Sequence, residues 1–194
     1  AGSATVAVQA EASPEEEKAY LEAFDLLKNG RYDDAILGFE HVLKNWPEGA
    51  YAANALYWSG ESHYVKRDYQ KALDNFLKLI EQFPDSTRTP DAMLKAGFAY
   101  EEQRKTAEAR RMLQRLVNEH GDSSAANLAR QRLELDRAKF QRTTCELFLK
   151  WYADHRAREI ADSKGQPAVK IEDLRQLMFG PLAPEDSKPV PPSG

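Results

Sequence analysis

The chain has 194 residues and a single cysteine, Cys145, so it can form no internal disulfide. Its apolar runs are only a few residues long, far short of the roughly 20 that a helix needs to cross a bilayer, and no membrane span is expected. Acidic residues outnumber basic ones by 31 to 27, and the two signs are interspersed along the chain. Because no strongly basic field results, the chain is not expected to bind nucleic acid through its phosphates.

Sequence patterns that indicate catalysis are also missing. The chain has no glycine-rich phosphate loop and no Gly-x-Ser-x-Gly element, and none of its four histidines stands in an HExxH or Cys/His metal spacing. Cys145 lacks a demonstrable histidine base. The acidic run Glu15–Glu17 is interpreted as solvated charge at a helix start. The sequence therefore predicts no enzyme, no metal and no cofactor.

The chain does contain a repeat, in which positions of the same kind recur 37 residues apart, as from Tyr32 to Tyr69. The aligned sets are Tyr32, Ala35, Phe39 and Pro47; Tyr69, Ala72, Phe76 and Pro84; and Thr106, Ala109, Leu113 and Gly121. A further phase holds small residues, namely Ala23, Gly60 and Gly97. Small residues let two helices approach closely, and large side chains fill the adjoining gaps. The repeat therefore predicts three helical hairpins.

Prolines and glycines separate these units and mark the helix ends. Helices are predicted at 15–28, 32–45, 50–65, 69–82, 88–103, 106–119 and 123–140. Helix-turn-helix units in tandem are typical of tetratricopeptide (TPR) repeats, whose usual period is about 34 residues. The predicted fold class is an all-α TPR solenoid of three hairpins with C-terminal capping helices. The alternative, a plain helical bundle, requires the phased positions to recur by chance.

The chain is predicted to have four parts. Residues 1–14 form a flexible linker, 15–133 the TPR domain, 134–163 a helical extension, and 164–194 a short helix with a disordered proline-rich tail. The extension carries an apolar stripe on a helix predicted at 142–162, made of Cys145, Leu147, Phe148, Trp151, Tyr152, His155 and Ile160. Because the end of a solenoid needs a cap, the stripe is predicted to seal the third repeat. The alternative is that it recruits a partner or a second copy of the chain.

In stacked hairpins the first helix of each unit lines the concave surface. Side chains one turn apart on these helices are therefore predicted to form a partner-binding groove. The predicted groove residues are Tyr20, Phe24, Tyr57, Trp58, Glu61, Tyr64, Asp91, Lys95, Phe98 and Glu102. Aromatic side chains are common binding hot spots, although several of these can instead pack between helices. A clamp for a C-terminal carboxylate is not expected, because only Lys95 in this set suits one.

Several segments resemble the TPR domain of the cell division coordinator CpoB (YbgF) family of the Tol-Pal system, over about residues 16–133. The segments are NALYWSGESHY at 54–64, FPDS at 83–86, DAMLKAGFAYEE at 91–102 and SAANLARQRL at 124–133. The resemblance implies a periplasmic, non-catalytic adaptor. It also implies contact with TolA and a link between the peptidoglycan synthase machinery and outer-membrane constriction during division.

Members of that family also carry a signal peptide and a trimerising N-terminal coiled coil. Residues 1–13 have neither a basic start nor a hydrophobic core of signal-peptide length, so the chain is expected to be a truncated form. Self-association through the missing region or through the C-terminal apolar helix stays open. The alternative function is a TPR scaffold or assembly subunit for outer-membrane or other multiprotein complexes. The residues after Leu133 have no counterpart in the family pattern.

Overall fold

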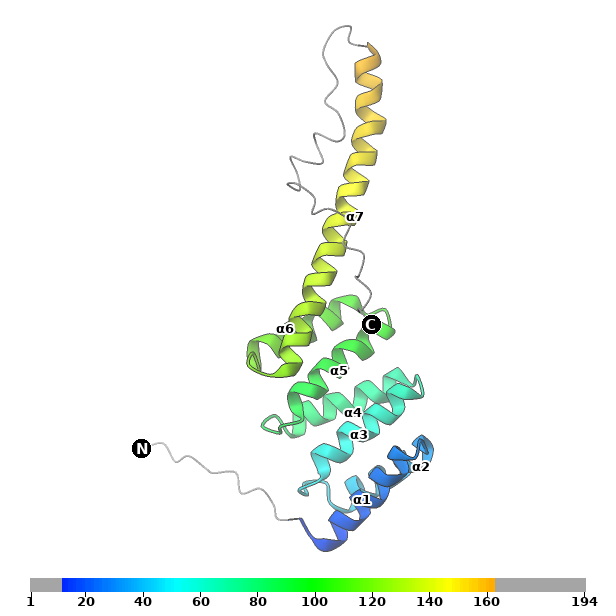
Figure 1. Cartoon of the computed structure of the whole chain (residues 1–194), viewed down its shortest axis with the longest axis vertical. Coiled ribbons are helices and arrows are strands. Elements are labelled where there is room, and N and C mark those ends of the chain that lie inside the picture. The colour runs from blue at the N-terminus through cyan, green and yellow to red at the C-terminus, as the bar shows by residue number, and fades with distance from the viewer. Residues whose placement is uncertain (1–11, 163–194) are drawn as a thin grey trace, which may run out of the picture. The chain divides into compact units, whose positions relative to one another are not determined.

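A computed structural model describes residues 12–162 of the chain, with side chains for residues 12–151 (Figure 1). This part contains seven α-helices and no strand. The helices are α1 (Pro14–Lys28), α2 (Tyr32–Asn45), α3 (Ala52–Val65), α4 (Tyr69–Gln82), α5 (Thr89–Glu102), α6 (Thr106–Glu119) and α7 (Ser124–Asp162). The first six agree with the predicted bounds to within two residues. The all-α class and the three hairpins are therefore confirmed.

The last helix differs from the prediction, because α7 is continuous where a break near Gln141 was expected. No proline or glycine lies between Gly121 and Gly165, so no residue in that stretch forces the helix to end. The chain divides into two compact units between Leu135 and Asp136. The predicted linker at 1–14 lies mostly outside the described residues, and the predicted tail at 164–194 lies wholly outside them.

Close helix contacts occupy the repeated small positions, as the sequence predicts. A methyl group built on Gly60 of α3 would lie 2.6 Å from the Phe76 ring of α4, and one on Gly97 of α5 would lie 2.6 Å from Leu113 of α6. Both Phe76 and Leu113 are fully buried. The second and third hairpins therefore close where a large side chain of the second helix lies against a small residue of the first.

The start of α7 completes the core of the hairpin stack. Ala125, Ala126 and Ala129 belong to the same buried cluster as Leu113, and Leu133 packs against its edge. The first turns of α7 therefore cover the third hairpin. Small side chains at these positions allow the helix to lie close to its neighbours.

The apolar stripe predicted further along α7 is not one continuous face. Cys145 and Leu149 are buried, whereas Leu147 and Trp151 are 64% and 55% exposed. Two residues correspond to about 200° around a helix, so the buried and exposed pairs lie on nearly opposite sides. Tyr152, His155 and Ile160 are beyond the described side chains. The sealing role of the stripe stays a prediction.

Glu16 corrects the interpretation of Glu15–Glu17 as solvated charge, since its side chain is buried while its two neighbours are exposed. Its Oε1 accepts a hydrogen bond of 2.7 Å from the backbone N–H of Tyr51. Gly49 makes room for the carboxylate, because a Cβ at that position would lie 2.3 Å from Oε1. Glu16 thus joins α1 to the loop before α3, a contact that the local sequence does not reveal.

Replacing Glu16 with Ala is expected to lower the free energy of unfolding by about 1–3 kcal/mol, because the buried N–H of Tyr51 loses its acceptor. Glu16→Gln retains a carbonyl oxygen and should keep most of the stability. Urea unfolding followed by circular dichroism measures both variants. Equal losses in the two would show that the charge of Glu16, rather than the hydrogen bond, supplies the stabilisation.

Candidate partner-binding face

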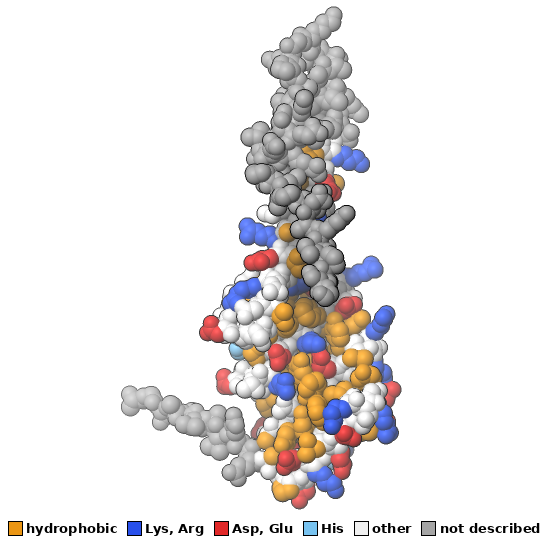
Figure 2. All heavy atoms as spheres, viewed as in Figure 1, with side chains coloured by type: hydrophobic (Ala, Val, Ile, Leu, Met, Phe, Trp, Pro, Cys, Tyr) orange, Lys and Arg blue, Asp and Glu red, His pale blue; other side chains and the backbone are white. Residues whose placement is uncertain are grey.

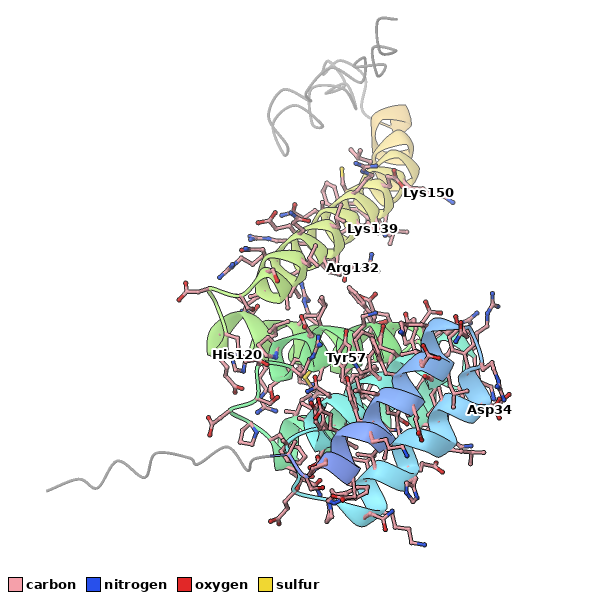
Figure 3. All side chains as sticks on the ribbon, turned by 60° about the horizontal axis from the view of Figure 1, so that its bottom comes forward. Asp34, Tyr57, His120, Arg132, Lys139 and Lys150 are labelled. Atoms are coloured by element: carbon pink, nitrogen blue, oxygen red, sulfur yellow. The ribbon has the colours of Figure 1, made fainter. Side chains whose placement is uncertain are left out.

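The predicted groove residues all lie on α1, α3 and α5, the first helices of the three hairpins. Figure 3 labels Tyr57, which lies within the hairpin stack. Figure 2 shows one face of this stack, where hydrophobic side chains form a band interrupted by acidic and basic groups. We call the partly exposed members of the predicted set the first-helix face. They are Phe24, Trp58, Glu61, Tyr64, Asp91, Lys95, Phe98 and Glu102.

The two remaining members of the predicted set, Tyr20 and Tyr57, lie in the core. They are 8% and 7% exposed, so they support the face from beneath rather than contribute surface to it. Tyr57 and Trp58 are neighbours in sequence, and the helix therefore turns them about 100° apart. Trp58 is accordingly only half-buried. Contact between this face and a partner stays a prediction.

Aromatic rings connect the first two hairpins at the face. The rings of Phe24 on α1 and Trp58 on α3 are 5.3 Å apart between centroids, and Trp58 lies 5.0 Å from Tyr57 in an edge-on arrangement. Phe24 also stacks with Tyr20 at 6.0 Å. These separations are within the range of favourable aromatic pairs. The contact between Phe24 and Trp58 crosses the boundary between two repeats.

Arg88 lies against the rings of Tyr57 and Trp58, although it is not one of the predicted groove residues. It precedes α5, and its guanidinium carbon lies 5.2 Å from the Tyr57 ring centroid and 5.3 Å from that of Trp58. Its Nε donates to Asn54 Oδ1 at 2.8 Å. Arg88 lies outside the predicted helix positions of the groove, and its only sequence signal is a spacing of 34 residues from Asn54.

Glu61 and Lys95 form the main ion pair of the face. Lys95 Nζ donates to Glu61 Oε2 at 2.7 Å, and the two residues are also 34 positions apart. The Lys95 ammonium lies 5.7 Å from the centre of the Tyr64 ring, a cation–π distance. The 34-residue spacing is three short of the 37-residue repeat, so each contact joins α3 to a position one turn earlier in the next unit.

Two polar atoms of the face are buried without a hydrogen-bond partner among the described residues: Trp58 Nε1 and Glu61 Oε1. Burial raises the pKa of the Tyr20 hydroxyl, and the nearby Trp58 indole opposes that rise without completing a hydrogen bond. Leaving a buried donor or acceptor unpaired costs about 1–3 kcal/mol. Trp58 and Glu61 are three residues apart on α3, so the free donor and the free acceptor lie one turn from each other.

Burial is the main cause of the raised pKa values of Tyr57 and Tyr64, and nearby carboxylates add to it. Burial raises the pKa of Tyr57, and the charges of Glu61 and Asp91 raise it further. At Tyr64, burial and the nearby Glu102 raise the pKa to about 12. Both phenols are therefore neutral at pH 7.

Neither a metal site nor a membrane-spanning helix is found among the described residues. Within the described residues, no group of three His, Cys, Asp or Glu side chains could hold a metal ion. No helix of that part is long and apolar enough to cross a membrane. Cys145 is a buried free thiol on α7.

The helical hairpins match known repeat families. Two tetratricopeptide repeat models match residues 20–87 and 91–123. The cell division coordinator CpoB of Pseudomonas putida is 43% identical over 58 residues, which are 29% of this chain and 22% of that protein. CpoB of Escherichia coli K12 is 44% identical over 36 residues, which are 19% of this chain and 14% of that protein. The matched segment thus spans about a fifth of the Pseudomonas putida protein and about a seventh of the Escherichia coli protein.

Two further matches are to proteins of other kinds. The serine/threonine-protein kinase PknD of Protochlamydia amoebophila is 39% identical over 70 residues, which are 34% of this chain but 7% of that protein. A crystal structure of a Bacteroides ovatus protein is 14% identical, with a TM-score of 0.41 over 82% of this chain and 76% of its own. The hairpin geometry and the two repeat matches together identify residues 20–123 as an all-α tetratricopeptide-repeat solenoid.

Proposed function

We propose that this chain is the partner-binding part of a CpoB-like adaptor of the periplasmic Tol-Pal system. In that role it binds TolA and coordinates peptidoglycan synthesis with outer-membrane constriction during cell division. The TPR repeats and the partial similarity to CpoB support a non-enzymatic protein-interaction adaptor. The match to PknD covers too little of that protein to suggest kinase activity.

The observation that carries the binding role is the pair Phe24 and Trp58, whose rings meet at 5.3 Å across a repeat boundary. Both side chains are partly exposed. Their neighbours fix them in place, so a partner can cover them at a small cost in conformational entropy. Such rigid aromatic groups are the usual anchors of a protein interface.

Replacing Trp58 with Ala is expected to weaken binding to a soluble TolA fragment by about 30-fold or more, as for a central hot-spot residue. Isothermal titration calorimetry with the full chain measures this. Leu37→Ala is the matched control, because Leu37 is an exposed apolar residue of α2, a second helix. Circular dichroism checks that both variants keep their helices.

The outcomes test the identity of the partner and the location of its binding surface separately. If the wild-type chain does not bind TolA, the TolA assignment is wrong. If it binds and Trp58→Ala binds equally well, the partner contacts another surface. A scaffold role in a different multiprotein complex is the second candidate, because the tetratricopeptide repeat matches by themselves do not specify a partner.

A further inference from the structure

The free atoms of the first-helix face suggest the chemistry of its ligand. A carboxylate can accept hydrogen bonds at both oxygens, yet Lys95 engages only Oε2 of Glu61 and leaves Oε1 buried without a donor. One turn away, Trp58 Nε1 needs an acceptor. A peptide with a basic side chain supplies both, because its cation donates and its backbone carbonyl accepts. A small amine would supply only the donor for Glu61 Oε1 and no acceptor for Trp58 Nε1.

Two long side chains lie over aromatic rings of Trp58 and Tyr64, next to these atoms. Lys95 and Arg88 lie over the rings of Tyr64 and Trp58, and their side chains are 29% and 34% exposed. Each is a long, flexible group that can extend into water with its charge still solvated. Moving them opens the face without any shift of a helix.

The rings beneath these side chains can also bind a cation that belongs to a ligand. The faces of aromatic rings attract ammonium and guanidinium groups, and Trp is the strongest in this respect. The intramolecular cations therefore mark positions where a cation of a ligand can lie. Lys95 occupies one such position over Tyr64.

The charges of the face favour a basic over an acidic ligand. The three cations at the face already have partners. Arg88 donates to Asn54 and lies 3.8 Å from the Asp91 carboxylate, Lys95 pairs with Glu61, and Lys28, which lies over the Phe24 ring, pairs with Asp25. An acidic peptide would have to break these contacts and would also approach Asp91 and the exposed Glu102.

We propose that the first-helix face recognises a basic peptide, whose Lys or Arg side chain replaces Lys95 at Glu61 and over Tyr64. A backbone carbonyl of the same peptide accepts the hydrogen bond of Trp58 Nε1. Lys95 thus acts as an internal competitor for the ligand. This inference shares its surface with the proposed function, but it does not require that the partner be TolA.

The test uses the full chain and three acetylated, amidated 12-residue peptides of Leu and Ala, which carry a central Lys, Gln or Glu. Calorimetry gives their affinities for the wild type and for three variants. Lys95→Met removes the competitor, Glu61→Gln removes the anion, and Trp58→Phe keeps a ring but removes the indole N–H. Lys95→Gln replaces Lys95→Met if the latter loses its helical spectrum.

We expect the Lys peptide to bind about 10-fold more tightly to Lys95→Met than to the wild type, and at least 10-fold more weakly to Glu61→Gln, as for a charged hydrogen bond gained or lost. Trp58→Phe should weaken all binding peptides several-fold. The Gln peptide should not distinguish Lys95→Met from the wild type. A merely structural role for Lys95 cannot produce tighter binding when the side chain is removed.

Two results would overturn the inference. One is a preference for the Glu peptide that Lys95→Met abolishes, which would make Lys95 the recognition group for an acidic partner. The other is binding of the Lys peptide that Glu61→Gln leaves unchanged. If the Lys peptide follows the expected pattern and TolA does not bind, the inference stands and the TolA assignment fails. If TolA binds through Trp58 and no Lys preference appears, the reverse holds.

Discussion

Phe76→Ala should lower the free energy of unfolding by about 3–5 kcal/mol, the usual loss for truncating a buried aromatic side chain. Phe76 lies on α4 and is fully buried in the core cluster that spans the second and third hairpins. Its ring fills the space above Gly60 and contacts Tyr57, with centroids 6.0 Å apart. The surrounding helices cannot collapse fully into the cavity, so the cost exceeds the simple transfer of the ring to water.

The control for this variant is Leu37→Ala, since Leu37 is 63% exposed on α2. It should change the free energy of unfolding by less than about 0.5 kcal/mol. Leu113→Ala tests the equivalent position of the third hairpin, where a loss of about 2–5 kcal/mol is expected. Urea unfolding gives all three values. A loss below about 1 kcal/mol for Phe76→Ala would contradict the close packing described for the second hairpin.

Gly60→Ala should also destabilise the fold, by about 1–3 kcal/mol, although alanine is the better helix former. The added methyl would lie 2.6 Å from Phe76 Cε1 and 2.9 Å from two further ring atoms. Because the ring is fully buried, it has no free space into which to move. The helices α3 and α4 must therefore separate.

The sign of the Gly60 effect should reverse when the ring is removed. In a Phe76→Ala background the methyl no longer meets the ring, and Gly60→Ala should stabilise the chain by up to about 1 kcal/mol through helix propensity. The four free energies of unfolding form a double-mutant cycle. A cost for Gly60→Ala that is the same in both backgrounds would show that backbone strain, not the Phe76 contact, is responsible.

The helix bounds of the hairpins were predictable because their signals are local. Proline or glycine follows α1, α2, α4 and α6, and the small and large positions recur at one spacing. The continuity of α7 was missed because a break near Gln141 was expected although no proline or glycine stands there. Periodicity alone also merged Cys145 and Leu147 into one stripe, although they lie on different sides of the helix.

The candidate face was only partly predictable. Repeat geometry selected the first helices, but it did not show that Tyr20 and Tyr57 would be buried beneath the face. It gave no sign that Arg88 would lie over the rings of Tyr57 and Trp58, because Arg88 precedes its helix and contacts residues of the previous unit. Glu16 was missed for a similar reason: its partner, Tyr51, is 35 residues away.

The contacts between Phe24 and Trp58 and between Glu61 and Lys95 each join two successive repeats. The proposed binding surface therefore exists only while neighbouring hairpins are packed against each other. In a linear array, where each repeat is stabilised by the one beside it, a ligand held by both sides strengthens the coupling between them. Partner binding should then make the array melt at a higher temperature and more cooperatively, and fraying of the first hairpin should release the partner before the rest unfolds.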